Sequence, residues 1–100
     1  MGYIRVDTVD NGQQIIDAKR VLNVNLASNG NYIDFILDFF TSTPNQPSQL
    51  RLNAVTAGSL NSDTLIQYND AVIAAQSIFV VDLTPVTGQE LQSLNYNPNP

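Results

Sequence analysis

Residues 20–40 read RVLNVNLASNGNYIDFILDFF, and this stretch decides the fold class. Apolar and polar residues alternate on both sides of Asn29-Gly30, as they do along two strands that are each buried on one face. Asn-Gly is the dipeptide that most often supplies the left-handed backbone of a tight hairpin turn. The stretch therefore predicts an antiparallel hairpin. Its inward residues are predicted to be Leu22, Val24 and Leu26 on the first strand and Ile33, Phe35, Leu37 and Phe39 on the second.

The same alternation predicts further strands on either side of this hairpin. Residues 3–9 alternate up to the turn sequence Asp10-Asn11-Gly12, which predicts a second tight hairpin. Two prolines in residues 41–49 predict a loop. The remaining predicted strands are residues 14–17, residues 50–56, which should pair with the Phe-rich strand, and residues 78–83, a buried last strand that ends before Pro85.

Only residues 61–76 have the period of an amphipathic helix. Ser62 is a suitable N-cap, and Asp63 places a negative charge in the first turn, where the helix dipole favours it. The positions that recur three and four residues apart are Leu65, Ile66, Asn69, Val72, Ile73 and Gln76.

These elements predict an α+β fold, with a mostly antiparallel sheet of five to six strands and one helix packed on it. An all-β sandwich is the alternative, but it needs about seven short strands. A chain of 100 residues is expected to form one domain. We assign residues 1–87 to this domain and residues 88–100 to a C-terminal tail, because the Asn and Pro residues near the end disfavour regular structure.

The chain contains no His, Cys or Trp. Without His and Cys it lacks the side chains that most often transfer protons or act as nucleophiles near neutral pH. Zinc and thiol chemistry are disfavoured for the same reason. We therefore predict that the protein is not an enzyme, with no catalytic residues and no cofactor.

The carboxylates do not form a recognisable catalytic or metal-binding pattern. Asp34 and Asp38 lie on one face of a predicted strand, roughly 13 Å apart at ~3.3 Å per residue. That exceeds the ~6.5–9.5 Å between the carboxylates of inverting glycosidases, so we interpret both as solvent-facing residues. Asp7, Asp10 and Asn11 do not follow the spacing of a calcium loop. The sequence predicts no metal site.

Charge is scarce on this chain. Only 13% of the residues are charged, about half the usual share of a soluble protein, while Asn and Gln make up a fifth. Such a surface suits a chain that neighbouring subunits largely cover. The net charge of -5 disfavours binding to nucleic-acid phosphates and to acidic membranes. No apolar run approaches the ~20 residues of a membrane span.

Five residues are predicted to contact partner proteins. Leu91, Leu94 and Tyr96 are apolar anchors in the predicted tail, which we expect to lie over a neighbouring subunit as an extended arm. A frayed terminus is the alternative. Tyr3 and Tyr32 are included because amphipathic tyrosines are enriched at protein interfaces.

Five short segments carry these features in chain order: a first strand, a Gly-Gln-hydrophobic turn, a Val-rich strand, a helix and a closing strand. They are residues 3–6, 12–16, 21–24, 70–75 and 80–85. In this order the chain resembles a group of small virion proteins of contractile-tailed cyanophages and related marine phages. The family's Trp and Thr-rich repeats are missing here. The resemblance spans most of the chain and implies a structural role, without assigning a function to any single residue.

We therefore expect a phage virion structural protein, an accessory or decoration subunit of the capsid or tail that acts by protein-protein assembly. Its partners would be other virion proteins and further copies of itself, in a trimer or larger oligomer. The alternative is a carbohydrate-binding or adhesion module that binds sugar hydroxyls through Asn, Gln, Asp and Tyr. The absence of Trp disfavours this alternative, because sugar faces bind well to broad aromatic rings.

Overall fold

The computed structural model describes residues 2–38, 48–77, 79–84 and 87–97. These residues form seven strands in two open, mostly antiparallel sheets, together with one α-helix, so the predicted α+β class is confirmed. The helix also rules out the all-β alternative. In chain order the elements are β1 (Tyr3–Thr8), β2 (Gly12–Asp17), the 3-10 turn η1 (Ala18–Arg20), β3 (Val21–Leu26), β4 (Tyr32–Leu37), β5 (Gln49–Ala54), α1 (Ser62–Ala75), β6 (Val80–Leu83) and β7 (Leu91–Asn97).

The predicted hairpin around Asn29-Gly30 is confirmed, and it belongs to the four-stranded sheet. β3 pairs antiparallel with β4, with Val24 opposite Phe35. Gly30 has a φ of +73°, and a Cβ there would meet the Leu60 carbonyl oxygen at 2.6 Å. Glycine is therefore required at this turn. β5 pairs with the other side of β4, and β7 pairs with β5, which gives the order β3-β4-β5-β7.

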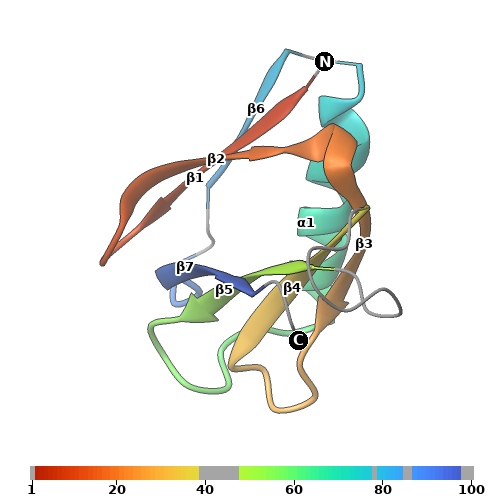
Figure 1. Ribbon diagram of the computed structural model, residues 1–100. Coiled ribbons are helices and arrows are strands. Elements are labelled where there is room, and N and C mark those ends of the chain that lie inside the picture. The colour runs from red at the N-terminus through yellow and green to blue at the C-terminus, as the bar shows by residue number, and fades with distance from the viewer. Residues whose placement is uncertain (1, 39–47, 78, 85–86, 98–100) are drawn as a thin grey trace.

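The second sheet has three strands in the order β2-β1-β6. The predicted hairpin at Asp10-Asn11-Gly12 joins β1 to β2, with Thr8 opposite Gly12. β6 pairs parallel to β1 after a long crossover that includes α1. Figure 1 shows the β1–β2 hairpin projecting away from the helix, and η1 redirecting the chain from β2 into β3.

Both sheets and α1 contribute to one hydrophobic core. α1 packs against β1, β3 and β6, and the Tyr68 ring stacks on Phe35 with the ring centroids 6.3 Å apart. The buried residues of this cluster are Ile4, Val6, Ile16, Ala18, Val24, Ile33, Phe35, Leu52, Leu60, Tyr68, Ala71, Val72, Ala75, Leu83 and Leu91.

The N-cap of the helix lies one residue before the predicted position, and the helix buries a different face than predicted. Asn61, not Ser62, is the N-cap, and it forms a reciprocal capping box with Thr64. The buried positions are Thr64, Tyr68, Ala71, Val72 and Ala75, whereas Ile66 and Ile73 are exposed. The small side chains explain the choice of face, because Ala71 and Ala75 allow a close approach. Gly2 packs so near that a Cβ there would overlap the Ala75 carbonyl oxygen.

Three details of the predicted strands are wrong. The strands divide into two sheets instead of one, because η1 turns the chain after β2. A register shift between Val21 and Asn23 turns Leu22 outward, where it is 68% exposed. Asp34 is not solvent-exposed as predicted: it lies on the side of β4 that faces away from the core, but it is only 7% exposed because Arg51 of β5 lies opposite it. The predicted positions of Phe39, Ile78, Pro85 and most of the 41–49 loop lie outside the described residues.

The predicted division into a domain of residues 1–87 and a tail of residues 88–100 is wrong for residues 91–97. These residues form β7, an antiparallel strand on the edge of β5. The strand predicted at residues 78–83 is therefore not the last strand of the chain. Leu91 is fully buried and Leu94 packs on the core. The edge of β5 supplies the hydrogen-bonding partners that this Asn-rich segment lacks by itself. Residues 98–100 lie outside the described part.

Replacement of Tyr68 by Phe should stabilise the protein. The Tyr68 hydroxyl is buried and has no hydrogen-bond partner among the described residues. Leaving such a group unsatisfied costs about 1–3 kcal/mol, so chemical denaturation of Tyr68→Phe at neutral pH should show a gain within that range. A less stable variant would mean that the hydroxyl has a partner.

The same variant should also change the response to alkaline pH. Burial raises the pKa of Tyr68 above the ordinary value of 10.0, so ionisation above pH 10 favours the unfolded chain. The stability that depends on the neutral hydroxyl is present below pH 10 and is lost as the pH rises toward the pKa of the folded state. Denaturation curves at increasing pH should therefore show a widening advantage for Tyr68→Phe, whereas a constant difference would contradict this coupling.

Candidate interaction surfaces

The side of the three-stranded sheet that faces away from the core carries a mixture of charged, amide and apolar side chains. We call this surface the Arg5 face. The β-sheet register places Arg5 between Ile15 of β2 and Asp82 of β6, and it places Asp7 beside Gln13. The Arg5 face consists of Tyr3, Arg5, Asp7, Gln13, Ile15, Val80 and Asp82.

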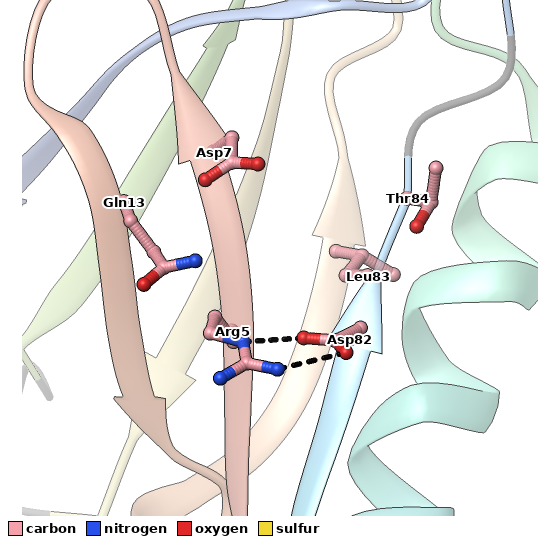
Figure 2. Close-up of a pocket in the computed structure, with 6 residues that line it drawn as sticks. All are labelled: Arg5, Asp7, Gln13, Asp82, Leu83 and Thr84. Carbon is pink, nitrogen blue, oxygen red and sulfur yellow. Dashed lines mark hydrogen bonds and ion pairs between the residues drawn. The ribbon is translucent and has the colours of Figure 1, made fainter.

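Arg5 and Asp82 form a two-point ion pair at the centre of this face (Figure 2). The Arg5 Nε donates to one Asp82 carboxylate oxygen, and Nη2 donates to the other at 2.9 Å. This hydrogen bonding holds the pKa of the Asp82 carboxyl below its ordinary value and raises the pKa of Arg5. Both side chains are well exposed, so the pair orients its groups and adds little to stability.

An open groove of about 310 Å³ lies beside this ion pair. Figure 2 shows the Asp7 and Gln13 side chains farther along the β1–β2 hairpin from Arg5, with Thr84 beyond the end of β6. The groove thus offers carboxylate oxygens, an amide, a hydroxyl and a guanidinium. These groups can exchange hydrogen bonds with a polar surface of another molecule.

Apolar side chains border the polar centre of the Arg5 face. Ile15 is 63% exposed and Phe79 is 72% exposed. The Phe79 ring meets the Tyr3 ring edge to face, with centroids 5.9 Å apart. Exposed apolar and aromatic side chains next to polar groups are features of protein contact surfaces, which usually have an apolar centre and a polar rim. On the Arg5 face this arrangement is reversed.

The corresponding outward side of the four-stranded sheet is more polar. Arg51 donates from Nε and Nη2 to the two oxygens of Asp34, at 2.9 and 3.0 Å. Its guanidinium carbon lies 3.7 Å from the centre of the Tyr32 ring. The hydrogen bonds to Asp34 raise the pKa of Arg51 against the opposing effect of burial.

Amide side chains surround this second ion pair. The register puts Asn25 beside Asp34, Asn53 beside Tyr32, and Asn95 beside Arg51. The Asn53 amide nitrogen donates to the Ser93 hydroxyl at 3.1 Å. We call this surface the amide face, and it consists of Asn23, Asn25, Tyr32, Asp34, Arg51, Asn53, Ser93 and Asn95.

The five predicted interface residues do not form one patch. Tyr3 belongs to the Arg5 face and Tyr32 to the amide face, which are on different sheets. Leu91 is fully buried in the core and Leu94 is partly buried against it, so neither is the exposed anchor that the sequence predicted. Tyr96 is half exposed, and its hydroxyl donates to the Ser48 hydroxyl at 3.2 Å. Tyr96 therefore remains the exposed member of the predicted C-terminal group.

The sequence prediction missed the two arginines and their partners. Arg5 and Arg51 interrupt alternating apolar residues, a pattern that indicates outward-facing positions but no partner. Their carboxylate partners lie 77 and 17 positions away along the chain. The parallel pairing of β1 with β6 brings Asp82 to Arg5, and no local pattern predicted that pairing. Exposure of Ile15 and Phe79 likewise depends on which sheet faces are covered.

The separated carboxylates Asp34 and Asp38 pair with different arginines. Asp34 binds Arg51, and Asp38 accepts a hydrogen bond from Arg20 Nε at 2.7 Å. Within the described residues, no cluster of three or more metal-ligating side chains is found. No helix in the described part of the chain is long and apolar enough to cross a membrane.

Comparisons of this chain with protein-family models, with curated proteins and with solved structures find no match. The geometry of the two outer faces is therefore the main guide to function.

The integration of β7 into the core can be tested with two matched Leu substitutions. Leu91→Ala should lower the free energy of unfolding by about 2–5 kcal/mol, because it removes a fully buried side chain. Leu22→Ala makes the same chemical change at an exposed position and should cost less than about 0.5 kcal/mol. Chemical denaturation measures both. Equal, small effects would contradict the position of β7.

Proposed function

We propose that the protein is a structural subunit that acts by protein-protein assembly, most specifically an accessory or decoration subunit of a phage capsid or tail. The observation that carries the proposal is the number of large apolar side chains that the described residues expose. They are Val9, Ile15, Leu22, Val55, Ile66, Ile73, Phe79 and Tyr96. In a chain of only 100 residues, this many exposed apolar side chains favour a protein whose surface is covered by neighbouring subunits. The phage context rests on the resemblance alone.

The charge distribution supports contact through neutral groups. Three of the four cations, Arg5, Arg20 and Arg51, are paired with carboxylates of the same chain. These pairs use three of the nine carboxylates, which leaves six without an ion pair within the described residues. The remaining charge is mostly negative, so contact with an acidic polymer is disfavoured. Amides and apolar groups are then the main means of contact with neighbours.

The assembly we propose contains several copies in the virion, in a trimer or larger closed ring, bound to other virion proteins. Closed symmetry lets one small set of contacts be repeated in every copy. Neither nucleic acid nor membrane is proposed as a partner, because the net charge of -5 repels both kinds of anionic surface.

This function is tested by finding the protein in purified particles. Mass spectrometry of purified virions, with copy counting, should detect the chain in multiple copies per particle. Purified protein should also bind particles that lack it. Absence from the virion together with failure to rebind would refute the proposal.

The amide face favours a second candidate, a carbohydrate-binding or adhesion module. Its amides, the Asp34–Arg51 pair and the Tyr32 ring could hydrogen-bond and stack against a sugar. A glycan array decides between the two candidates. Specific glycan binding that is lost in Asn53→Ala would favour the module, and an array without binders would remove it.

A further inference from the structure

The two sheets have four edges, and two of them are already occupied by groups of the same chain. At the start of β7, the N–H groups of Val9 and Asp10 donate to the carbonyls of Leu91 and Gln92, at 3.1 and 2.8 Å. The Asn11 side-chain oxygen accepts from the Leu94 N–H at 3.0 Å. The tip of the β1–β2 hairpin thus covers this edge.

The β3 edge is also protected. Its register shift disrupts the regular ladder. The Asn23 side-chain oxygen accepts the Val24 N–H at 2.9 Å, and α1 packs against the strand. Natural proteins use bulges and covering elements of this kind to keep an edge from pairing with another chain.

The two edges of the three-stranded sheet differ from these. β6 has only four residues and carries Asp82, which is engaged by Arg5. β2 has six residues, contains no Pro and no cation, and has its single charge at the last position, Asp17. Among the described residues no strand pairs with its outer side. Of the four edges that the described residues form, β2 is therefore the long and unprotected one.

The register identifies which main-chain groups of β2 face outward. The Ala18 N–H donates to the Gly2 carbonyl at 3.1 Å, so this pair is of the hydrogen-bonded kind. Hydrogen-bonded and non-hydrogen-bonded pairs alternate along an antiparallel ladder. The pairs Arg5–Ile15 and Asp7–Gln13 are then non-hydrogen-bonded. The N–H and C=O groups of Gln13 and Ile15 consequently point to the free edge.

We infer that β2 pairs antiparallel with β2 of a second copy of this chain, across a two-fold axis at Ile15. The two three-stranded sheets would then join into one continuous six-stranded sheet in the order β6-β1-β2 followed by β2-β1-β6 of the second copy. This contact rests on the proposed assembly function and deepens it by naming the edge and the partner.

The side chains of β2 complement one another in this register. Ile15 faces Ile15 of the second copy, so that a side chain now 63% exposed gains an apolar neighbour. Gln13 faces Asp17 of the second copy, and the same pair recurs on the other side of the axis. The amide can donate to the carboxylate, and no like charges meet directly. A second copy is therefore the occupant that the edge itself favours.

A two-fold contact is compatible with the proposed ring. In an assembly with dihedral symmetry, two-fold contacts join two rings whose members touch through other surfaces. The exposed apolar residues outside β2, such as Val55 and Phe79, remain available for those contacts.

Sedimentation of two matched variants tests the contact. The wild-type chain should form dimers or larger even-numbered assemblies. Ile15→Lys should raise the dissociation constant of the two-fold contact at least about tenfold, because two lysines would then face each other directly. Ile73→Lys makes the same change at a position of similar exposure, 59%, and should leave this contact unchanged. A monomeric wild type, or equal effects of the two variants, would overturn the inference.

Cysteine cross-linking tests the register without a destabilising charge. The chain has no cysteine of its own, and Cα atoms of a hydrogen-bonded antiparallel pair lie ~5.5 Å apart, within disulfide range. Ile15→Cys should therefore form a covalent dimer rapidly under mild oxidation, and Ile73→Cys should not. If Ile15→Lys fails to fold, this pair of variants decides. Equal cross-linking of both would exclude the proposed register.

The two proposals can fail independently. Particle binding by a chain that stays monomeric and does not cross-link at position 15 would overturn the β2 contact and leave the structural function in place. A chain that cross-links at position 15 but neither occurs in particles nor binds them would support the contact and refute the virion role.

Discussion

The stacking of Tyr68 on Phe35 is the contact on which the rest of the structure depends. Phe35 lies on β4, which is paired on both sides within the four-stranded sheet, and Tyr68 lies on the buried face of α1. The same helix packs against β1 and β6. This aromatic contact therefore holds the helix against the four-stranded sheet, while the small residues of α1 allow the three-stranded sheet to pack closely. Both outer faces are positioned by this arrangement.

The two outer faces follow a common design, in which an arginine is held by a carboxylate on the neighbouring strand. Arg5 pairs with Asp82, and Arg51 pairs with Asp34. Each pair orients one guanidinium and one carboxylate, and the two opposite charges neutralise each other locally. What remains for contact is mostly amide, hydroxyl and apolar surface. In this way a chain with so few charges presents ordered polar groups beside exposed apolar side chains.

Much of the local structure could be predicted from particular residues. Asn11-Gly12 and Asn29-Gly30 predicted both hairpin turns, since glycine readily adopts the positive φ found at both positions. Alternation predicted that Ile33, Phe35 and Leu37 face inward, and all three are buried. The sites were harder to predict. Of the five expected interface residues, Leu91 lies in the core and Leu94 packs against it. Arg5, Asp82 and Ile15 of the Arg5 face were not identified from the sequence.

The sequence by itself determined the turns, the strand segments of both hairpins and the approximate extent of the helix, because these depend on backbone preferences and periodicity within a few residues. Only the tertiary structure decided that the strands divide into two sheets, that α1 buries the face with Ala71 and Ala75, and that residues 91–97 form β7. These outcomes depend on which edges and faces are still uncovered once the core has formed. Arg5 meets Asp82, and no described strand pairs with the outer edge of β2, for the same reason: strand partners are chosen over distances along the chain that no local pattern spans.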